Sequence, residues 1–483
     1  MGLKLVRITA VVVAVLFAII GALVLASMGH PAALRPLEGP RVTRIDNARV
    51  ISMSDGAPTV QTGVSVLVQD GVVAAVAVPD EIETPPDARI IDAAGQTLMP
   101  GLIDAHVHVW DEAELCGYLA HGVTSVRNMS GMPFHRALMR RIEGGRLLGP
   151  DFVTTGPILN SPGPNQQVIH QLIANADEAR EAVRAQHAAG HRTLKLYSNV
   201  TVEAYAAILE EARALGMQIV GHTPEGVRGE GVPHERPFEI AFEDVLDDGY
   251  GTIEHTESIV WHGLRDHLDE DQMRALAARI AASGVVVTPT LIAHANLVRV
   301  AESEGAYLDR PGVDTINPLL KRFEADSYAF WSGQDPQARE APRAAFYLTA
   351  TRLMHEAGVP LIAGSDAGIF TNIPGSSLTR ELELLVEAGL SPYEALTAAT
   401  ATAGPAIGLA DRGQIAPGFR ANLVLVAGDP LLDVSIVEAP SAVMIGGVWL
   451  DAEALEDLRE GGRQTSTLRT GRRLIELMLA LRN

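Results

Sequence analysis

The sequence is poor in cysteine, in basic residues and in aromatic residues. Cys116 is its one cysteine, so no disulfide can form within the chain and packing must stabilise the fold. The 38 Lys and Arg are outnumbered by 59 Asp and Glu, and the formal charge of -21 excludes the basic surface that nucleic-acid binding requires. Because 47% of the residues are hydrophobic and 20% are charged, the chain can bury a large core and is not disordered.

One long run near the start of the sequence carries no charge. Ile8 to Met28 is mostly Val, Ala, Leu and Ile, and the cations Lys4 and Arg7 precede it. A helix of this length spans about 31 Å, roughly the hydrocarbon core of a bilayer. We therefore expect residues 1–40 to form a membrane anchor and linker, with the body on the periplasmic or extracellular side. The alternative is a signal peptide cleaved near residues 24–26, which would give a secreted or periplasmic protein.

Two β-rich stretches lie far apart in the sequence. In residues 41–98, an Asp-Gly pair at positions 70–71 separates two valine-rich runs, which is a hairpin signal. Residues 411–455 contain further short apolar runs, with Gly446-Gly447 as a turn. Because neither stretch can bury a face alone, we expect both to form one small β-sandwich domain.

Between these stretches, residues 99–410 alternate short apolar strands with amphipathic helices such as 201–215 and 269–282. Eight strand–helix units in a row predict an α/β fold of the (β/α)8 TIM-barrel type, whose chemistry lies at the carboxyl ends of its strands. Residues 456–483 are predicted to be a helical tail of no evident function. The expected strands end at His108, Arg127, Thr155, Tyr197, His222, His255, Pro289 and Asp366.

Potential metal ligands stand at several of these strand ends. His106 and His108 are two positions apart in a strand, so both face the same way and suit a divalent cation. Alone, such a pair is more often structural. His222, His255 and Asp366 end later strands, and their nitrogen and carboxylate atoms are ordinary zinc donors.

Lys195 also lies in a predicted strand, where an ammonium would repel a cation. A lysine paired on the surface is the ordinary interpretation. However, Leu194 and Leu196 flank it, and if they face the helices, Lys195 must face the barrel interior. A neutral lysine there could take up carbon dioxide and form a carbamate able to bridge two metals.

These motifs resemble the metal-dependent amidohydrolase superfamily, specifically its imidazolonepropionase-like and prolidase-like members. The resemblance extends from about Thr43 to Leu450 and rests on residues 100–108, 194–197, 221–222, 252–255, 364–368 and 413–418. It implies two divalent metal ions, with zinc as the first choice. By this resemblance, one metal is held by His106, His108 and Asp366, the other by His222 and His255, and N6-carboxylated Lys195 bridges them.

The expected reaction is hydrolysis of a C–N bond in an amide, a peptide-like substrate or a cyclic amide, with dipeptides and N-acyl amino acids as candidates. Two metals about 3.5–4 Å apart would activate a shared water as hydroxide and polarise the carbonyl. Asp366 would take the proton and pass it to the leaving nitrogen. Tyr197 would donate to the oxyanion or act as a rim aromatic. Arg127 would meet a substrate carboxylate or form a structural salt bridge.

Other functions stay open at this point. His222 and Glu225 have the His-x-x-Glu spacing of mononuclear-metal deaminases, with Glu225 as proton shuttle, although such enzymes do not use an inward Lys195. Lactone or phosphotriester hydrolysis is compatible with the same ligands, because ligands do not name the electrophile. A membrane-tethered binding protein without catalysis is disfavoured by the complete ligand set. The expected partner is a small-molecule substrate, and a homo-oligomer stays open.

Overall fold

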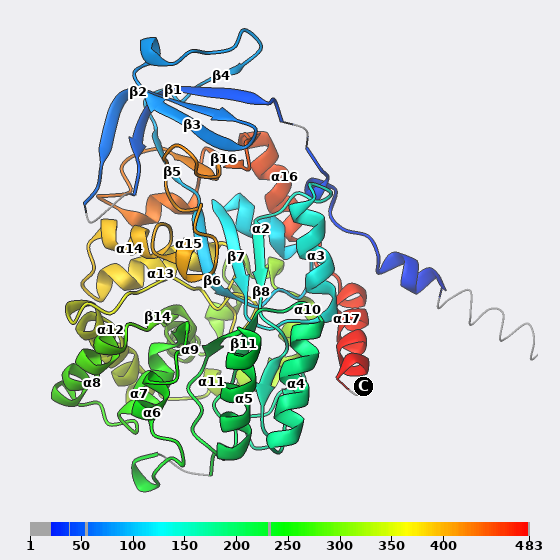
Figure 1. Ribbon diagram of the computed structural model, residues 1–483, viewed down its shortest axis with the longest axis vertical. Helices are drawn as coiled ribbons and strands as arrows, with labels where there is room; N and C mark the ends of the chain where they lie inside the picture. The colour runs from blue at the N-terminus through cyan, green and yellow to red at the C-terminus, as the bar shows by residue number, and fades with distance from the viewer. Residues whose placement is uncertain (1–20, 38, 54–56, 230–232, 482–483) are drawn as a thin grey trace, which may run out of the picture.

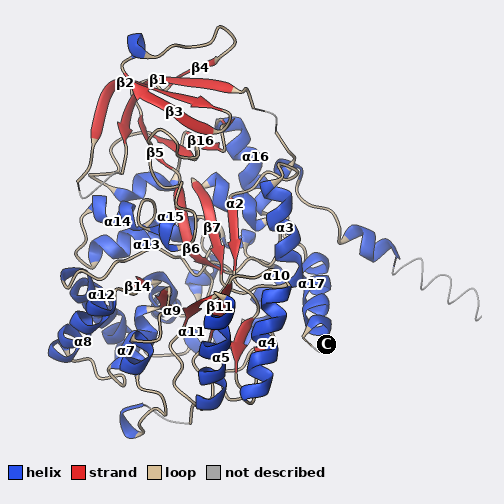
Figure 2. Cartoon of the chain, in the orientation of Figure 1, coloured by secondary structure: helices blue, strands red, loops and turns tan. Residues whose placement is uncertain are grey.

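The structure is a computed structural model that describes residues 21–37, 39–53, 57–229 and 233–481. Figure 1 shows a β-sheet at one end of the molecule, drawn from the blue and orange parts of the chain, with the barrel beside it. In Figure 2, helices surround the strands of the barrel. The predicted α/β barrel is therefore confirmed.

The sheet has eight strands in the order β17-β16-β15-β5-β1-β2-β3, with β4 beside β1. Its β2–β3 turn falls on Asp70 and Gly71, whose positive φ values of 48° and 80° suit a tight hairpin. The strands are β1 (Val42–Ile51), β2 (Val60–Gln69), β3 (Val72–Ala77), β4 (Arg89–Asp92), β5 (Thr97–Pro100), β15 (Leu423–Val426), β16 (Ala442–Ile445) and β17 (Val448–Leu450).

This sheet corrects the predicted β-sandwich, because its strands form one hydrogen-bonded sheet rather than two. Strand β1 pairs with β4 along its first half and with β5 along its second, and its register is irregular between Ile45 and Val50. Such irregularities bend a strand. The sheet curls until Val72 in β3 bridges Arg420, just before β15, and an apolar cluster with members from both ends of the body fills the curl.

Seven regular strands of the barrel run parallel to their neighbours. A hydrogen bond from the Gly156 amide to the Thr193 carbonyl (3.1 Å) joins the third strand to the fourth. The strands are β6 (Leu102–Val107), β7 (Val123–Asn128), β8 (Asp151–Thr154), β11 (Thr193–Leu196), β12 (Gln218–Gly221), β13 (Thr252–Glu254) and β14 (Val286–Thr288).

The eighth strand is an extended segment, residues 361–366, with isolated bridges in place of a regular ladder. Leu361, at the start of the segment, bridges Val287 in β14, and Ala367, just after its end, bridges Val107 in β6. These two bridges close the ring. Gly364 lets the segment lie against β6, because a Cβ there would stand 2.7 Å from the Cβ of His106. The segment that carries Asp366 is thus held directly against the strand that carries His106 and His108.

Two short strands that were not predicted, β9 (Ile158–Asn160) and β10 (His170–Leu172), lie between the third and fourth barrel strands. They pair with each other, and Leu159 in β9 pairs with Leu196 at the end of β11. The loop between them is therefore held at the carboxyl end of the barrel.

Both predicted helices are present, as α5 (Val202–Leu215) and α8 (Glu270–Ser283). Thr201 and Asp269 cap their amino ends, and a glycine with positive φ follows each helix. The other helices in residues 99–410 are α2 (Glu114–Ala120), α3 (Pro133–Glu143), α4 (Ala176–Ala188), α6 (Phe242–Leu246), α7 (Thr256–Gly263), α9 (Leu291–Glu302), α10 (Pro318–Phe323), α11 (Ala325–Ser332), α12 (Glu340–Glu356), α13 (Ser376–Glu387), α14 (Pro392–Ala398) and α15 (Ala403–Ala406). Helices α9 to α12 all lie in the connection from β14 to the eighth strand, where one helix would be enough.

The C-terminal tail packs on the barrel rather than extending from it. Helix α16 (Ala452–Gly462) contacts α2, and α17 (Thr467–Ala480) contacts α3 and α10. Arg469 in α17 forms a buried ion pair with Asp111 (3.0 Å). The tail therefore stabilises one side of the barrel.

The predicted membrane anchor, Ile8 to Met28, lies for the most part outside the described residues. Residues 21–26 are helical. After this helix, the Gly29 carbonyl accepts a hydrogen bond from Arg469 (3.3 Å), which holds the segment beside α17. In the described part of the chain, no helix has both the length and the apolar character needed to cross a bilayer.

Candidate metal centre

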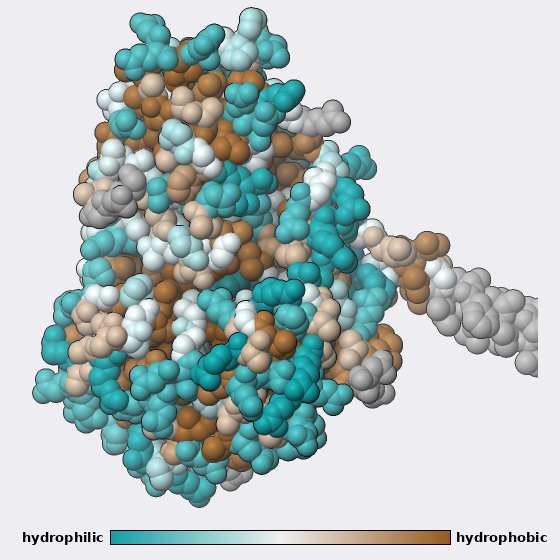
Figure 3. Space-filling view, in the orientation of Figure 1, coloured by the Kyte–Doolittle hydropathy of each residue, from teal (hydrophilic) through white to brown (hydrophobic). Residues whose placement is uncertain are grey.

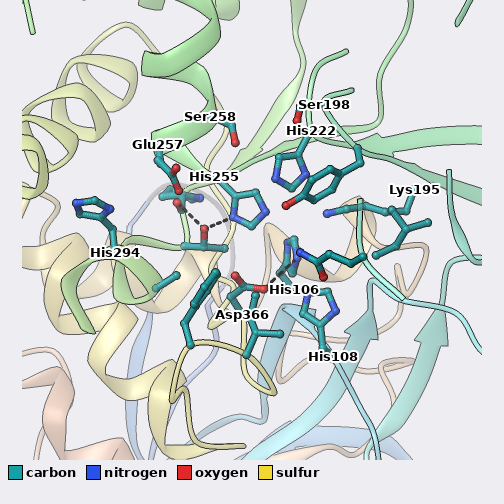
Figure 4. Close-up of a pocket in the computed structure, with 18 of the residues that line it drawn as sticks. His106, His108, Lys195, Ser198, His222, His255, Glu257, Ser258, His294 and Asp366 are labelled. Atoms are coloured by element: carbon teal, nitrogen blue, oxygen red, sulfur yellow. Dashed lines mark hydrogen bonds and ion pairs between the residues drawn. The ribbon is translucent and has the colours of Figure 1, made fainter. Parts of the chain in front are cut away.

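The six predicted ligand residues converge on one cavity. They come from five places around the barrel: the end of β6, the middle of β11, the positions after β12 and β13, and the end of the eighth strand. Figure 4 shows the imidazoles and the Lys195 amine pointing into a common space beside the Asp366 carboxylate. The residues that share this cavity are His106, His108, Lys195, His222, His255 and Asp366.

His106, His108 and Asp366 form one candidate cation site. The Nε2 atoms of His108 and His106 lie 3.0 Å and 3.4 Å from the same Asp366 oxygen, Oδ1. All three residues are buried, and one potential ligand atom of each lies within 4.8 Å of the others. Two imidazole nitrogens with one carboxylate oxygen are a donor set typical of zinc.

His222 and His255 lie beside this group. Their ring centroids are 4.5 Å apart, and the ring of His255 is 4.7 Å from that of His106. The ring of Tyr197 lies 4.3 Å from that of His222 on the other side. The second predicted pair of ligands is thus adjacent to the first group, within the same cavity.

Lys195 faces the barrel interior, as its flanking leucines predict. Its side chain is 1% exposed, and its amine has no hydrogen-bond partner among the described residues. Burial lowers the pKa of this amine to about 8, although the charges of Glu254 and Asp366 oppose the shift. Gly221 makes room for the side chain, because a Cβ at that position would lie 2.8 Å from the Lys195 Cδ.

Glu254 fixes the ring of His106. It accepts a hydrogen bond from His106 Nδ1 (2.7 Å) and another from the Arg127 guanidinium (2.9 Å). Because Nδ1 is occupied, Nε2 of His106 faces the cavity. Burial would raise the pKa of the Glu254 carboxyl, but Arg127 and Lys195 hold it below its ordinary value. Arg127 therefore forms the structural ion pair, one of its two predicted roles.

Four non-glycine residues that line the cavity have positive φ values: His255 (70°), Thr290 (48°), Asp366 (53°) and Phe370 (46°). Such a conformation costs a non-glycine residue about 1–3 kcal/mol. In a regular strand, His255 would face away from the side to which Glu254 points. The positive φ at His255 breaks this alternation, so that both residues face inward, and the Thr290 hydroxyl lies 2.6 Å from His255 Nδ1.

The protonation states of the group suit metal binding. Burial lowers the pKa values of His106, His222 and His255 well below the ordinary range, and neighbouring positive charges add to the effect. These rings are neutral near pH 7, which is the form that binds a metal. Burial would raise the pKa of Asp366, but His108, His255 and Lys195 outweigh it, so this carboxyl is ionised.

The donor atoms fit the metal ions that the fold implies. His106 Nε2, His222 Nδ1 and the Lys195 amine are buried and, within the described ranges, lack a hydrogen-bond partner. Each buried polar atom left unpaired costs about 1–3 kcal/mol. Coordination would satisfy the imidazole nitrogens directly. The amine would need to become an anion first, as in a carbamate.

Residues that were not predicted also line the cavity, among them His170, Arg228 and Glu257. The ring of His170, in β10, lies 4.7 Å from that of Tyr197, and Arg228 lies in the loop after β12. His294, in α9 after the seventh strand, also lines the cavity. Loops at the carboxyl end of a barrel carry function, but their sequence does not show which side chains turn inward.

Glu225, the proton shuttle of the deaminase alternative, is not among the described residues that line the cavity. Both of its carboxylate oxygens accept hydrogen bonds from Arg228, at 2.7 Å and 3.0 Å. The Trp261 indole donates to the same carboxylate (3.3 Å). Glu225 therefore anchors Arg228, which disfavours the deaminase alternative.

Known proteins share this architecture. The model of the amidohydrolase family matches residues 117–450. Imidazolonepropionase from Streptomyces griseus is 27% identical over 395 residues, which cover 76% of this chain and 86% of that protein. A solved bottromycin amidohydrolase superposes with a TM-score of 0.68 at 25% identity, covering 92% of this chain and 93% of that one. A Xaa-Pro dipeptidase structure with methionine bound in its active site has a TM-score of 0.64 at 20% identity. The match covers 85% of this chain and 100% of that one. At this identity, it shows similarity of fold alone.

Proposed function

Because the chain belongs to the amidohydrolase family and is a hydrolase acting on C–N bonds, we propose that it cleaves an amide, peptide-like or cyclic amide bond at a two-metal centre. The observation that supports this most is the shared cavity, in which a buried His-His-Asp group lies beside two further histidines and an inward lysine. Zinc suits these donors. The proposed ligands are His106, His108 and Asp366 for one metal, His222 and His255 for the other, and carboxylated Lys195 between them.

Metal ions bound there would lower the pKa of a shared water and polarise the substrate carbonyl. The chain's own groups carry the other steps. Asp366 accepts a proton from the attacking water and donates it to the leaving nitrogen. Glu254 holds the His106 ring in place, so the ligand geometry is set before substrate binds.

Tyr197 is the proposed donor to the oxyanion. Its side chain lines the cavity next to His222, and burial raises the pKa of its phenol to about 12. The phenol therefore stays protonated and can donate a hydrogen bond at neutral pH. Replacing Tyr197 with Phe is expected to lower kcat more than it changes KM, because the bond strengthens as negative charge develops.

The cavity favours a substrate with a carboxylate. Among the described residues that line the cavity, Lys195 and Arg228 are the two that are lysine or arginine. The guanidinium of Arg228 has five N–H donors. Its Nε and Nη2 atoms donate to Glu225, so other donors remain for a second carboxylate. Dipeptides and N-acyl amino acids carry such a group next to the bond to be cleaved, and they are the proposed substrates.

Metal analysis of the purified full chain tests the centre. Two metal ions per chain are expected, falling to one or none in Lys195→Ala, with loss of hydrolysis across dipeptides, N-acyl amino acids and lactams. Added propionate should restore part of the activity of Lys195→Ala, because a small carboxylate can take the place of the carbamate oxygens.

Lys321→Ala, on α10, is the matched control and should keep both metals and full activity. Two metals retained in Lys195→Ala would refute the lysine bridge. Release of ammonia from an amino-heterocycle by an enzyme with one metal would instead favour the deaminase. A metal-free wild-type protein without hydrolase activity would favour the binding-protein alternative.

We also propose that the body sits at a membrane on its periplasmic or extracellular side. In support, apolar side chains are exposed on residues 21–28 and on the outer face of α17, where Leu25 is 71% and Ile475 55% exposed. The space-filling view shows brown atoms on the described part of the N-terminal segment (Figure 3). A sodium carbonate wash of membranes tests this, since an anchored chain stays in the pellet and a cleaved product is released.

A further inference from the structure

A second cavity adjoins the metal centre. The two cavities share five lining residues, so they lie side by side. We call the second cavity the outer chamber. The shared residues are Arg228, Glu257, Ser258, His294 and Tyr347. In Figure 4, Glu257 lies near His255, on the side of the cavity where His294 lies.

The outer chamber is rich in aromatic side chains. Trp261 from α7, Trp331 from α11 and Tyr347 from α12 line it, together with Leu297 from α9. The whole chain has four tryptophans and only 5% aromatic residues, and two of those tryptophans meet here. Trp261 and Trp331 are only partly buried, so part of their surface remains accessible.

The charged side chains of the chamber neutralise one another. Arg343 forms an ion pair with Asp266, and Glu340 lies 3.2 Å from His294. Arg228 is already paired with Glu225, at 2.7 Å. These pairs leave the aromatic surface and the remaining N–H donors of Arg228 for a ligand.

Glu257 is the exception. Its carboxylate forms no ion pair with a described residue, and its side chain is exposed between the two cavities. Its negative charge raises the pKa values of the Tyr197 and Tyr347 phenols, second only to burial in each case, which places the charge near both cavities. A second carboxylate entering the chamber would be repelled. The group that fits is therefore aromatic and carries no negative charge.

We propose that the outer chamber binds an uncharged aromatic group of the substrate while the amide lies at the metal centre. This inference rests on the proposed function and narrows its substrates to N-acyl amino acids or dipeptides with an aromatic group on one side of the scissile bond. Offset or edge-to-face contacts with Trp261 and Trp331 would favour such a group over a methyl group by about tenfold in kcat/KM.

Three matched substrates test the proposal with the zinc-loaded full chain. N-acetyl-L-alanine has no aromatic group, N-benzoyl-L-alanine has one on the acyl side, and N-acetyl-L-phenylalanine has one on the amine side. At least one aromatic substrate should have a kcat/KM about tenfold above that of N-acetyl-L-alanine. In Trp331→Ala, this preference should fall below threefold, because KM should rise more for the aromatic substrate than for N-acetyl-L-alanine.

Two variants keep the test specific. Trp331→Phe should retain most of the preference, because a smaller ring can still stack. Phe323→Ala removes an aromatic side chain of α10, which is 53% exposed and does not line the described part of either cavity, and should change nothing.

Binding to metal-free protein separates this inference from the proposed function. Calorimetric titration with N-benzoyl-L-alanine and N-acetyl-L-phenylalanine should show at least one of them binding wild type several-fold more tightly than Trp331→Ala. If binding shows this pattern but no substrate is hydrolysed, the proposed function fails and the chamber stands. Hydrolysis with equal kcat/KM for all three substrates, unchanged in Trp331→Ala, would overturn the chamber.

Discussion

The metal centre and the outer chamber share residues, yet they are built in different ways. Every candidate ligand lies in or just after a barrel strand and is largely buried, and hydrogen bonds fix the rings of His106, through Glu254, and of His255, through Thr290. The chamber is lined mainly by helices, and its tryptophans are partly exposed. In the function proposed above, the barrel provides the chemistry, and α7 together with the helices between the seventh and eighth strands binds the aromatic group of the substrate.

The contrast has a physical origin. Parallel strands bring residues that are far apart in sequence to one rim with little freedom, because each strand is hydrogen-bonded to its neighbours. Helices α10 to α12 have no such ladder and depend on side-chain pairs such as Arg343 with Asp266. Changes in the chamber should therefore be tolerated better than changes in the centre.

The largest expected effect is that of Asp366→Asn. The amide keeps the shape of the side chain but carries no charge and cannot accept the proton of the attacking water. We expect kcat to fall by about 10³-fold, with loss of bound metal. Steady-state kinetics and metal analysis measure this. Asp335→Asn, at an exposed turn before α12, is the control and should behave as wild type; more than a tenth of wild-type activity in Asp366→Asn would contradict its role.

Glu254→Gln tests whether the hydrogen bond that holds the His106 ring is important for metal binding and stability. It leaves Arg127 buried without its charged partner, so the free energy of unfolding should fall by about 3 kcal/mol. Metal affinity should fall by about 10- to 100-fold, because the anchor of His106 is weakened. Urea denaturation and titration of metal-free protein give the two values.

The double variant Arg127→Met with Glu254→Gln separates these two effects. It removes the unpaired charge, so the free energy of unfolding should partly recover. Metal affinity should stay low, because the His106 anchor is still weakened. Recovery of both quantities together would show that Glu254 acts on stability alone.

Glu324→Gln probes the link between the inserted helices and the cavity. Glu324 precedes α11 and accepts a hydrogen bond (3.0 Å) from the amide of Phe370, a residue that lines the cavity. Burial raises the pKa of the Glu324 carboxyl to about 6. The folded state therefore holds this proton more tightly than the unfolded state. As pH rises from about 4.5 to 6, wild type should lose up to about 2 kcal/mol of stability relative to Glu324→Gln. Urea denaturation of both proteins across this range measures the difference, and parallel pH profiles would rule it out.

Arg339→Ala should have the smallest effect. Its side chain is 54% exposed and lies 3.6 Å from Glu340, a buried carboxylate that His294 and Arg343 also contact, so the loss of Arg339 leaves Glu340 with partners. The free energy of unfolding should change by less than about 0.5 kcal/mol, and kcat/KM by less than twofold. Thermal denaturation and kinetics measure both. A tenfold loss of kcat/KM would show that the chamber binds substrate through charge and not through aromatic surface.

Local sequence patterns predicted the elements and most of the candidate site. His106 and His108 face the cavity because strand positions two apart share a side, and Lys195 faces it because leucines flank it. Helices α5 and α8 begin directly after Thr201 and Asp269 because those side chains cap the first turn. All of these signals act within a few residues of the chain.

The features that were missed depend on distant contacts. Glu254 stood next to a predicted ligand, yet its partners His106 and Arg127 come from two other strands. The single curled sheet depends on where β1 changes partner, and an alternating pattern does not contain that information.

By itself, the sequence determined an α/β barrel with a metal-binding rim, because periodicity, capping and strand alternation are properties of near neighbours. The tertiary structure alone decided which second partners hold the ligands and which loop side chains enter the cavity. It also decided that Trp261 and Trp331 share one chamber. Such contacts depend on the path of long connections and on packing between distant segments, for which a single sequence carries no local signal.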